Sequence, residues 1–109
     1  MTVAVDEVRG VRRVSLSGRL DADGLRSVED EFHAAATAEP NVIVDLSGVD
    51  FLASLGIRML VAASQDQEEL GGRLVLAGPD AMTMRILKAT GIDQLVPVHA
   101  TSDDAASAF

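Results

Sequence analysis

Apolar and polar residues alternate over the first twenty positions of the chain. The apolar positions on either side of Gly10 are Val3, Val5, Val8, Val14 and Leu16. A period of two predicts strands with one buried and one solvated face, and a glycine between two such runs predicts a tight turn. The chain is therefore expected to open with an antiparallel hairpin.

The rest of the chain alternates between helical spacing and short aliphatic runs. Three longer helices are expected to begin at Asp21 or Asp23, at Ser54 and at Asp80, and to end before Pro40, Gly71 and Gly91. The runs 42–46 and 73–77 are typical of strands covered on both faces in a parallel sheet. Residues 95–99 favour a short last strand, and residues 102–109 a terminal helix with an acidic first turn.

This order of elements predicts an α/β fold in which residues 1–109 form a single domain. We expect a mixed, mostly parallel β-sheet of about five strands with helices packed on one face. The junction between the central strand and the second long helix, residues 49–58, then has the least usual combination of polar and apolar residues in the chain.

Composition narrows the possible functions. Seventeen acidic residues oppose nine basic ones, for a net charge of -8. Such a surface repels nucleic acid and anionic lipid, so neither nucleic-acid binding nor direct membrane insertion is expected. The chain has no cysteine, and its N-terminal segment lacks the apolar run of a signal peptide. A cytoplasmic protein is the expectation.

The sequence carries no pattern typical of an enzyme. His33 and His99 have no partners at metal-ligand spacing, and no glycine-rich phosphate loop is present. Ser54 lacks both the first glycine of a G-x-S-x-G turn and an evident histidine base. We therefore predict no catalytic residue, no metal and no cofactor.

Three features of the junction need a common explanation. Phe51, Leu52 and Leu55 form an apolar group where water usually reaches, Gly56 falls in a first helical turn, and Arg58 lies four residues beyond Ser54. One interpretation makes Ser54 an N-cap and Gly56 a site of close packing. The other makes the junction a docking surface whose serine receives a phosphate, which a helix N-terminus tolerates. Both interpretations can hold together.

The segment Asp45-Leu46-Ser47-Gly48-Val49-Asp50-Phe51-Leu52-Ala53-Ser54-Leu55-Gly56 resembles the STAS domain of anti-sigma factor antagonists, a family also found at the cytosolic end of sulfate transporters. Gly18-Arg19-Leu20-Asp21 is similar to a second landmark of that family. The resemblance covers nearly the whole chain. It implies a partner-binding surface that holds Asp21, Asp23, Phe51, Leu52, Ala53, Leu55, Gly56 and Arg58 around a phosphorylation site at Ser54.

The resemblance further implies that the unphosphorylated protein binds an anti-sigma factor with a histidine-kinase-like ATPase fold and so releases a sigma factor. That kinase would phosphorylate Ser54, and a phosphatase would reverse the step. Many members of the family have Asp before the serine and a small residue after it, where this chain has Ala53 and Leu55. The alternative is a non-switching STAS subunit of an ATP-binding cassette complex that transports lipid.

Overall fold

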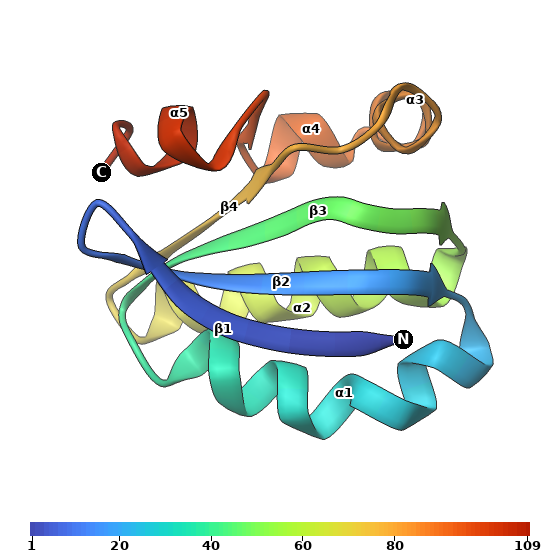
Figure 1. Cartoon of the computed structure of the whole chain (residues 1–109), viewed down its shortest axis with the longest axis horizontal. Coiled ribbons are helices and arrows are strands. Elements are labelled where there is room, and N and C mark those ends of the chain that lie inside the picture. Colours follow the sequence, from blue (N-terminus) through green and yellow to red (C-terminus); the bar gives the residue numbers. More distant parts are fainter.

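A computed structural model describes all residues, 1–109, and shows one sheet flanked by helices (Figure 1). In chain order the elements are β1 (Thr2–Val8), β2 (Val11–Leu20), α1 (Ala22–Thr37), β3 (Asn41–Leu52), α2 (Ser54–Glu69), β4 (Arg73–Ala77), α3 (Ala81–Ala89), α4 (Ile92–Leu95), β5 (Val98–His99) and α5 (Ser102–Ala106). The predicted hairpin and the three longer helices are present.

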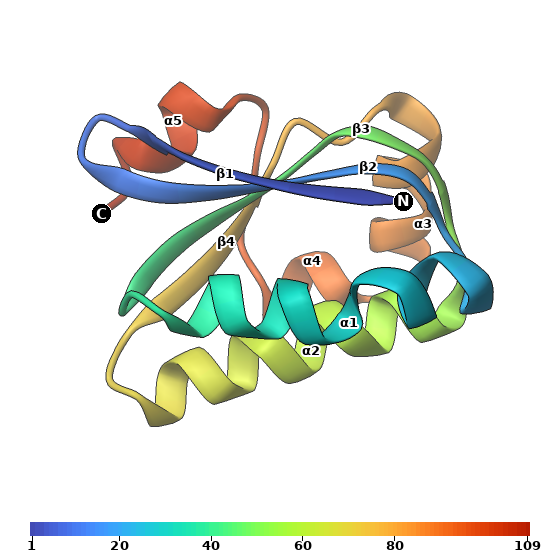
Figure 2. The same ribbon diagram turned by 60° about the horizontal axis from the view of Figure 1, so that its bottom comes forward.

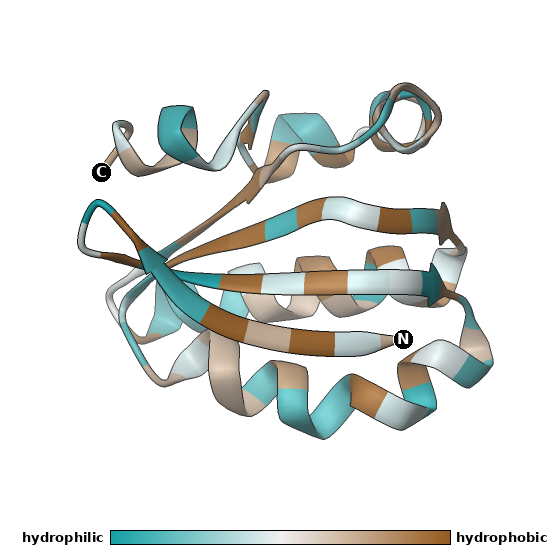
Figure 3. Ribbon diagram, in the orientation of Figure 1, coloured by the Kyte–Doolittle hydropathy of each residue, from teal (hydrophilic) through white to brown (hydrophobic).

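The sheet has five strands in the order β1-β2-β3-β4-β5, with β1 antiparallel to β2 and the other pairs parallel. A two-residue turn, Arg9 and Gly10, joins β1 to β2. Both residues have positive φ angles, as two-residue hairpin turns require. The predicted mixed, mostly parallel α/β fold is confirmed. Figure 3 shows the alternation of apolar and polar residues along β1 and β2 from which the hairpin was predicted.

Helices α1 and α2 run side by side across one face of the sheet (Figure 2). They enclose the main core, to which β2, β3 and β4 contribute fully buried aliphatic side chains, among them Val14, Leu16, Val42, Val44, Leu74 and Leu76. Phe32 of α1 and Leu60 of α2 close it from the helix side. Apolar burial on this face is the main stabilising contribution to the fold.

We expected helices packed on one face of the sheet, but α5 packs on the opposite face. Ala105 and Ala106 of α5 meet Ile43, Val75 and Ala77 of the sheet in a second apolar cluster. In Figure 2 α5 lies on the other side of the sheet from α1 and α2. Both faces of β3 and β4 are therefore buried over residues 42–46 and 74–77, which explains their continuous apolar sequences.

Two element boundaries also differ from the sequence prediction. Strand β3 continues past residue 46 to Leu52, because two register shifts let it stay paired with β2 from Ser17 to Leu20. Leu95, the first residue of the predicted last strand, is instead the end of a single helical turn, α4, whose N-cap is Gly91 with a positive φ. Only Val98 and His99 remain as β5.

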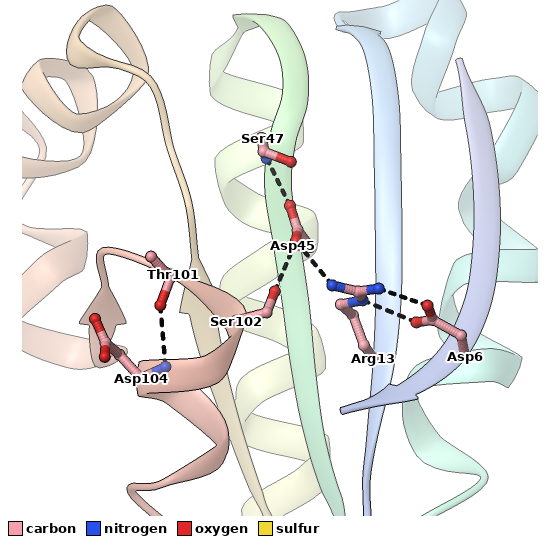
Figure 4. A network of polar contacts seen from close by, with 7 residues as sticks. All are labelled: Asp6, Arg13, Asp45, Ser47, Thr101, Ser102 and Asp104. Atoms are coloured by element: carbon pink, nitrogen blue, oxygen red, sulfur yellow. Dashed lines mark hydrogen bonds and ion pairs between the residues drawn. The ribbon is translucent and has the colours of Figure 1, made fainter. Parts of the chain in front are cut away.

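A line of polar contacts crosses the second face and fixes α5 (Figure 4). Asp45 on β3 accepts hydrogen bonds from the Ser47 amide at 2.8 Å and from the Ser102 hydroxyl at 2.7 Å. Arg13 on β2 lies 3.8 Å from Asp45 and donates from Nε to Asp6 on β1 at 2.8 Å. Asp45 thus links β3 to α5 directly, and through Arg13 and Asp6 it is connected to β2 and β1.

Charge and hydrogen bonding keep Asp45 ionised despite its burial. Burial alone raises the pKa of the Asp45 carboxyl, but hydrogen bonds from Ser47 and Ser102 and the charge of Arg13 outweigh it and hold the pKa below its ordinary value. A carboxylate with a depressed pKa contributes stability above the unfolded-state pKa, and this contribution is lost as the pH falls through the folded-state pKa.

We expect Asp45→Ala to lower the free energy of unfolding by about 2 kcal/mol at neutral pH, because Arg13 and Ser102 lose a buried acceptor. Urea unfolding measures the change. Asp103→Ala removes an exposed contact with Arg9 at 3.7 Å and a weaker attraction to Arg13, and it should cost less than about 1 kcal/mol. The difference between wild type and Asp45→Ala should shrink below about pH 4, and a difference independent of pH would contradict this account.

Candidate functional site

The candidate site is the junction between β3 and α2, at the carboxyl end of the central strand. Leu52 is still paired with Leu20 of β2, and the amide of Ala53 donates to the Leu20 carbonyl at 3.1 Å. The helix begins at the next residue, Ser54. The turn from strand to helix is therefore held against the end of β2, where the Gly18–Asp21 motif lies.

Ser54 is the first residue of α2 and is exposed. The N-cap is Ala53, with extended backbone angles and no side-chain hydrogen bond to the helix. The interpretation of Ser54 as the cap is therefore wrong, because the helix starts one residue earlier than capping by Ser54 would require. Its hydroxyl stands at a helix N-terminus with no structural task there.

Gly56 is buried, and close packing accounts for it. A Cβ at this position would overlap the Leu20 side chain and lie 2.8 Å from the Leu20 carbonyl oxygen. The glycine thus lets the first turn of α2 rest directly on the end of β2. Leu52 is also buried, at 4% exposure. These two predicted docking residues support the surface from beneath and are not themselves available to a partner.

The exposed part of the junction is apolar. Phe51 and Leu55 are 39% and 41% exposed and stand on either side of Ser54 in the sequence. The Arg19 guanidinium lies over the Phe51 ring, 4.3 Å from its centroid. Arg19 was not among the predicted site residues. Its place in the Gly18–Asp21 motif was the sequence signal that could have identified it.

Asp21 lies beside this group and has a structural task. It caps α1 by accepting from the Gly24 amide at 2.9 Å, and the Arg19 Nε lies 3.2 Å from its other oxygen. The Gly24 hydrogen bond, followed by Arg19, lowers the pKa of the Asp21 carboxyl. Of the two expected caps of α1, the structure uses Asp21. Asp21, Arg19 and Phe51 thus form one connected edge of the site.

The two remaining predicted residues are exposed on the first turns of the helices. Asp23 lies in the first turn of α1 and approaches Arg26 at 3.8 Å. Arg58 projects from α2 one turn beyond Ser54 and has no ion-pair partner within 4.0 Å. We call the exposed set Arg19, Asp21, Phe51, Ser54, Leu55 and Arg58 the Ser54 surface.

The Ser54 surface is suited to binding and carries no arrangement typical of catalysis. It contains no histidine, and its one carboxylate, Asp21, is engaged by the Gly24 amide and Arg19. The structure brings together no group of three histidine or carboxylate side chains placed to hold a metal ion. None of the helices has the length and apolar character needed to cross a bilayer. What the surface offers is an exposed apolar rim, one free cation and an unengaged hydroxyl.

Comparison with known proteins agrees with this geometry. Residues 3–97 match a family model described as "Mlab, STAS domain". Among curated proteins, the anti-sigma-F factor antagonist RsfB of Mycobacterium tuberculosis is 28% identical over 108 residues, which cover 96% of this chain and 86% of RsfB. RsfA of the same organism is 30% identical over 94 residues, 84% of this chain and 73% of RsfA.

Among solved structures, an anti-sigma factor antagonist from Mycobacterium paratuberculosis superimposes with a TM-score of 0.86 at 32% identity, covering 98% of this chain and 92% of that one. The fold of this chain is thus similar to that of an anti-sigma factor antagonist of known structure. The chain belongs to the STAS domain family.

Gly56→Ala should destabilise the protein by about 1 to 3 kcal/mol, because the added methyl group cannot enter the contact with Leu20 without displacing α2. In an exposed helix the same change would be stabilising by about 1 kcal/mol, so the sign of the effect is the test. Thermal or urea unfolding measures it. A stabilised variant would show that α2 does not rest on Leu20 in solution.

Ser54→Ala should leave the free energy of unfolding within about 0.5 kcal/mol of wild type, as expected for an exposed side chain without a partner. The measurement is the same unfolding experiment, with Thr101→Ala as a positive control. Thr101 caps α5 through the Asp104 amide at 3.0 Å, and losing a cap costs about 1 kcal/mol. An equal loss in both variants would restore the capping role of Ser54.

Proposed function

We propose that this protein is an anti-sigma factor antagonist, a binding protein that docks an anti-sigma factor through the Ser54 surface and so releases a sigma factor. The observation that carries the proposal is the exposed serine at the start of α2, which has no structural task and is flanked in the sequence by the exposed apolar residues Phe51 and Leu55. The relatives named as antagonists align over most of their own lengths, which supports the same role for the whole chain.

Phosphorylation of Ser54 is the proposed switch. A phosphate carries about -1.5 to -2 charges and holds water strongly. Between Phe51 and Leu55 it would bring that charge into an apolar interface, where desolvation and repulsion weaken binding by several kcal/mol. The helix N-terminus and the free Arg58 would stabilise the phosphorylated state of the isolated protein. Both effects, the weaker binding and the stabilised phosphate, favour the free phosphorylated antagonist over its complex.

The partners in this proposal are an anti-sigma factor with a histidine-kinase-like ATPase fold, which acts as the serine kinase, and a phosphatase that restores binding. The site of action is the cytoplasm, where sigma factors work. The protein itself is the substrate of the kinase and performs no chemistry.

A second candidate is a non-switching subunit of an ATP-binding cassette complex that handles lipid. The observation in its favour is the pair of residues flanking the serine, Ala53 and Leu55, which make the surface more apolar than a kinase substrate requires. Such a subunit would use the same rim but would not depend on the charge at position 54.

The switch is tested by incubating the purified chain with ATP and each anti-sigma kinase of the host, followed by intact-mass analysis. We expect wild type to gain one phosphate and Ser54→Ala to gain none. If no host kinase modifies the wild-type chain, the switch is refuted. Modification of Ser54→Ala would place the phosphate elsewhere.

The effect of charge is tested by calorimetry with the cognate anti-sigma factor. Ser54→Asp should weaken binding at least tenfold, while Ser54→Ala should bind within about threefold of wild type, because only the aspartate brings charge into the apolar rim. Equal affinity of the two variants would favour the transport subunit over the switch.

A further inference from the structure

Helix α3 lies at the end of the sheet that carries the Ser54 surface. Strand β4 ends at Ala77, level with Asp45, whereas β3 continues to Leu52. Helix α3 follows β4 in the chain and packs against β3. Figures 1 and 2 both show it beside the end of β3, where α2 begins. A partner bound over Ser54 therefore has α3 within its reach.

One side of α3 is buried and the other is exposed. Thr83 and Leu87 are the buried residues of this helix. Met82, Arg85 and Lys88 are exposed and follow one another at intervals of three residues, so they lie along one side of the helix. The exposed fraction of Met82 is 63%. We call these three exposed residues the α3 stripe.

The two cations of the α3 stripe have no acidic partner, although acidic residues outnumber basic ones seventeen to nine. Five of the basic residues, all arginines, have a carboxylate within 4.0 Å. The four that have none are Arg58, Arg73, Arg85 and Lys88. Lys88 lies in the last turn of α3, where the helix dipole favours a cation, but Arg85 has no such local role. A shortage of carboxylates does not explain these unpaired cations.

The chemistry of the α3 stripe indicates what it binds. Methionine and arginine are enriched in protein–protein interfaces. A segment with an apolar side chain beside acidic ones would cover Met82 and pair with Arg85 and Lys88. A second copy of this chain also offers acidic residues, but a net charge of -8 on each copy opposes their association. The partner already proposed for the Ser54 surface, at the same end of the sheet, is therefore the favoured occupant.

We propose that the α3 stripe is a second docking element for the anti-sigma factor, which places an apolar side chain against Met82 and acidic side chains against Arg85 and Lys88. This proposal rests on the proposed function and deepens it by stating the chemistry of the partner's contact segment. Only an anti-sigma factor with acidic residues at this position gains the attraction, so the α3 stripe contributes to the choice among partners.

The contribution of charge is tested with two double variants that change the net charge equally. Arg85→Glu with Lys88→Glu reverses the charge of the α3 stripe. Arg9→Glu with Arg73→Glu reverses two exposed cations at the opposite end of the sheet. At about 0.15 M salt, where charges are screened over about 8 Å, we expect the first variant to bind the cognate anti-sigma factor at least tenfold more weakly, because like charges then face each other. The second should stay within about threefold of wild type, because its changes lie beyond the screening distance.

The apolar contribution is tested with two single variants that are matched for exposure. Met82→Ala should weaken binding about fivefold, because less apolar area is buried against the partner. Leu70 is 62% exposed at the far end of α2, and Leu70→Ala should change the affinity by less than about twofold. Both side chains are exposed, so both variants are expected to unfold near wild type.

Equal affinities of the two double variants would overturn the role of the α3 stripe, and weaker binding of Ser54→Asp would still support antagonism. If the α3 double variant does not fold, the comparison of Met82→Ala with Leu70→Ala decides alone. Wild type that binds no anti-sigma factor of the host would overturn both proposals. Self-association of wild type that Arg85→Glu with Lys88→Glu abolishes would assign the α3 stripe to a second copy instead.

Discussion

The contact between Gly56 and Leu20 is the constraint on which the Ser54 surface depends. Because position 56 has no side chain, the first turn of α2 rests on the end of β2, and the Ala53 amide reaches the Leu20 carbonyl. A larger residue at position 56 would push the first turn of α2, which carries Ser54, away from the end of β2. The surface is therefore positioned by rigid strands and a helix, which gives it a fixed shape before any partner arrives.

The two faces of the sheet are stabilised by different means. Helices α1 and α2 bury a wide apolar face, and their packing also holds the start of α2. The second face has only five buried apolar residues and adds the polar line through Asp45 and Arg13.

The sequence was sufficient to predict the elements whose pattern is local. The alternation of apolar and polar residues predicted the hairpin, helical spacing predicted α1, α2 and α3, and the motif around Ser54 indicated the candidate site. The close packing of Gly56 was one of the sequence-based interpretations, and the structure identifies its partner as Leu20. Two features could not be predicted because they depend on tertiary contacts. The extension of β3 to Leu52 comes from register shifts against β2, and the placement of α5 comes from the hydrogen bond between Ser102 and Asp45. The role of Arg19 likewise requires knowing which strands are neighbours.

The alanine before Ser54 bears on how a phosphate would act in this chain. A carboxylate at position 53 would repel a phosphate on the next residue, and with Ala53 that repulsion is absent. The phosphate would then meet the N-terminus of α2 and the free Arg58, both of which favour negative charge. The phosphorylated chain is for this reason expected to keep its fold and its surface shape. The switch would act through charge within the interface and would need no rearrangement of the antagonist.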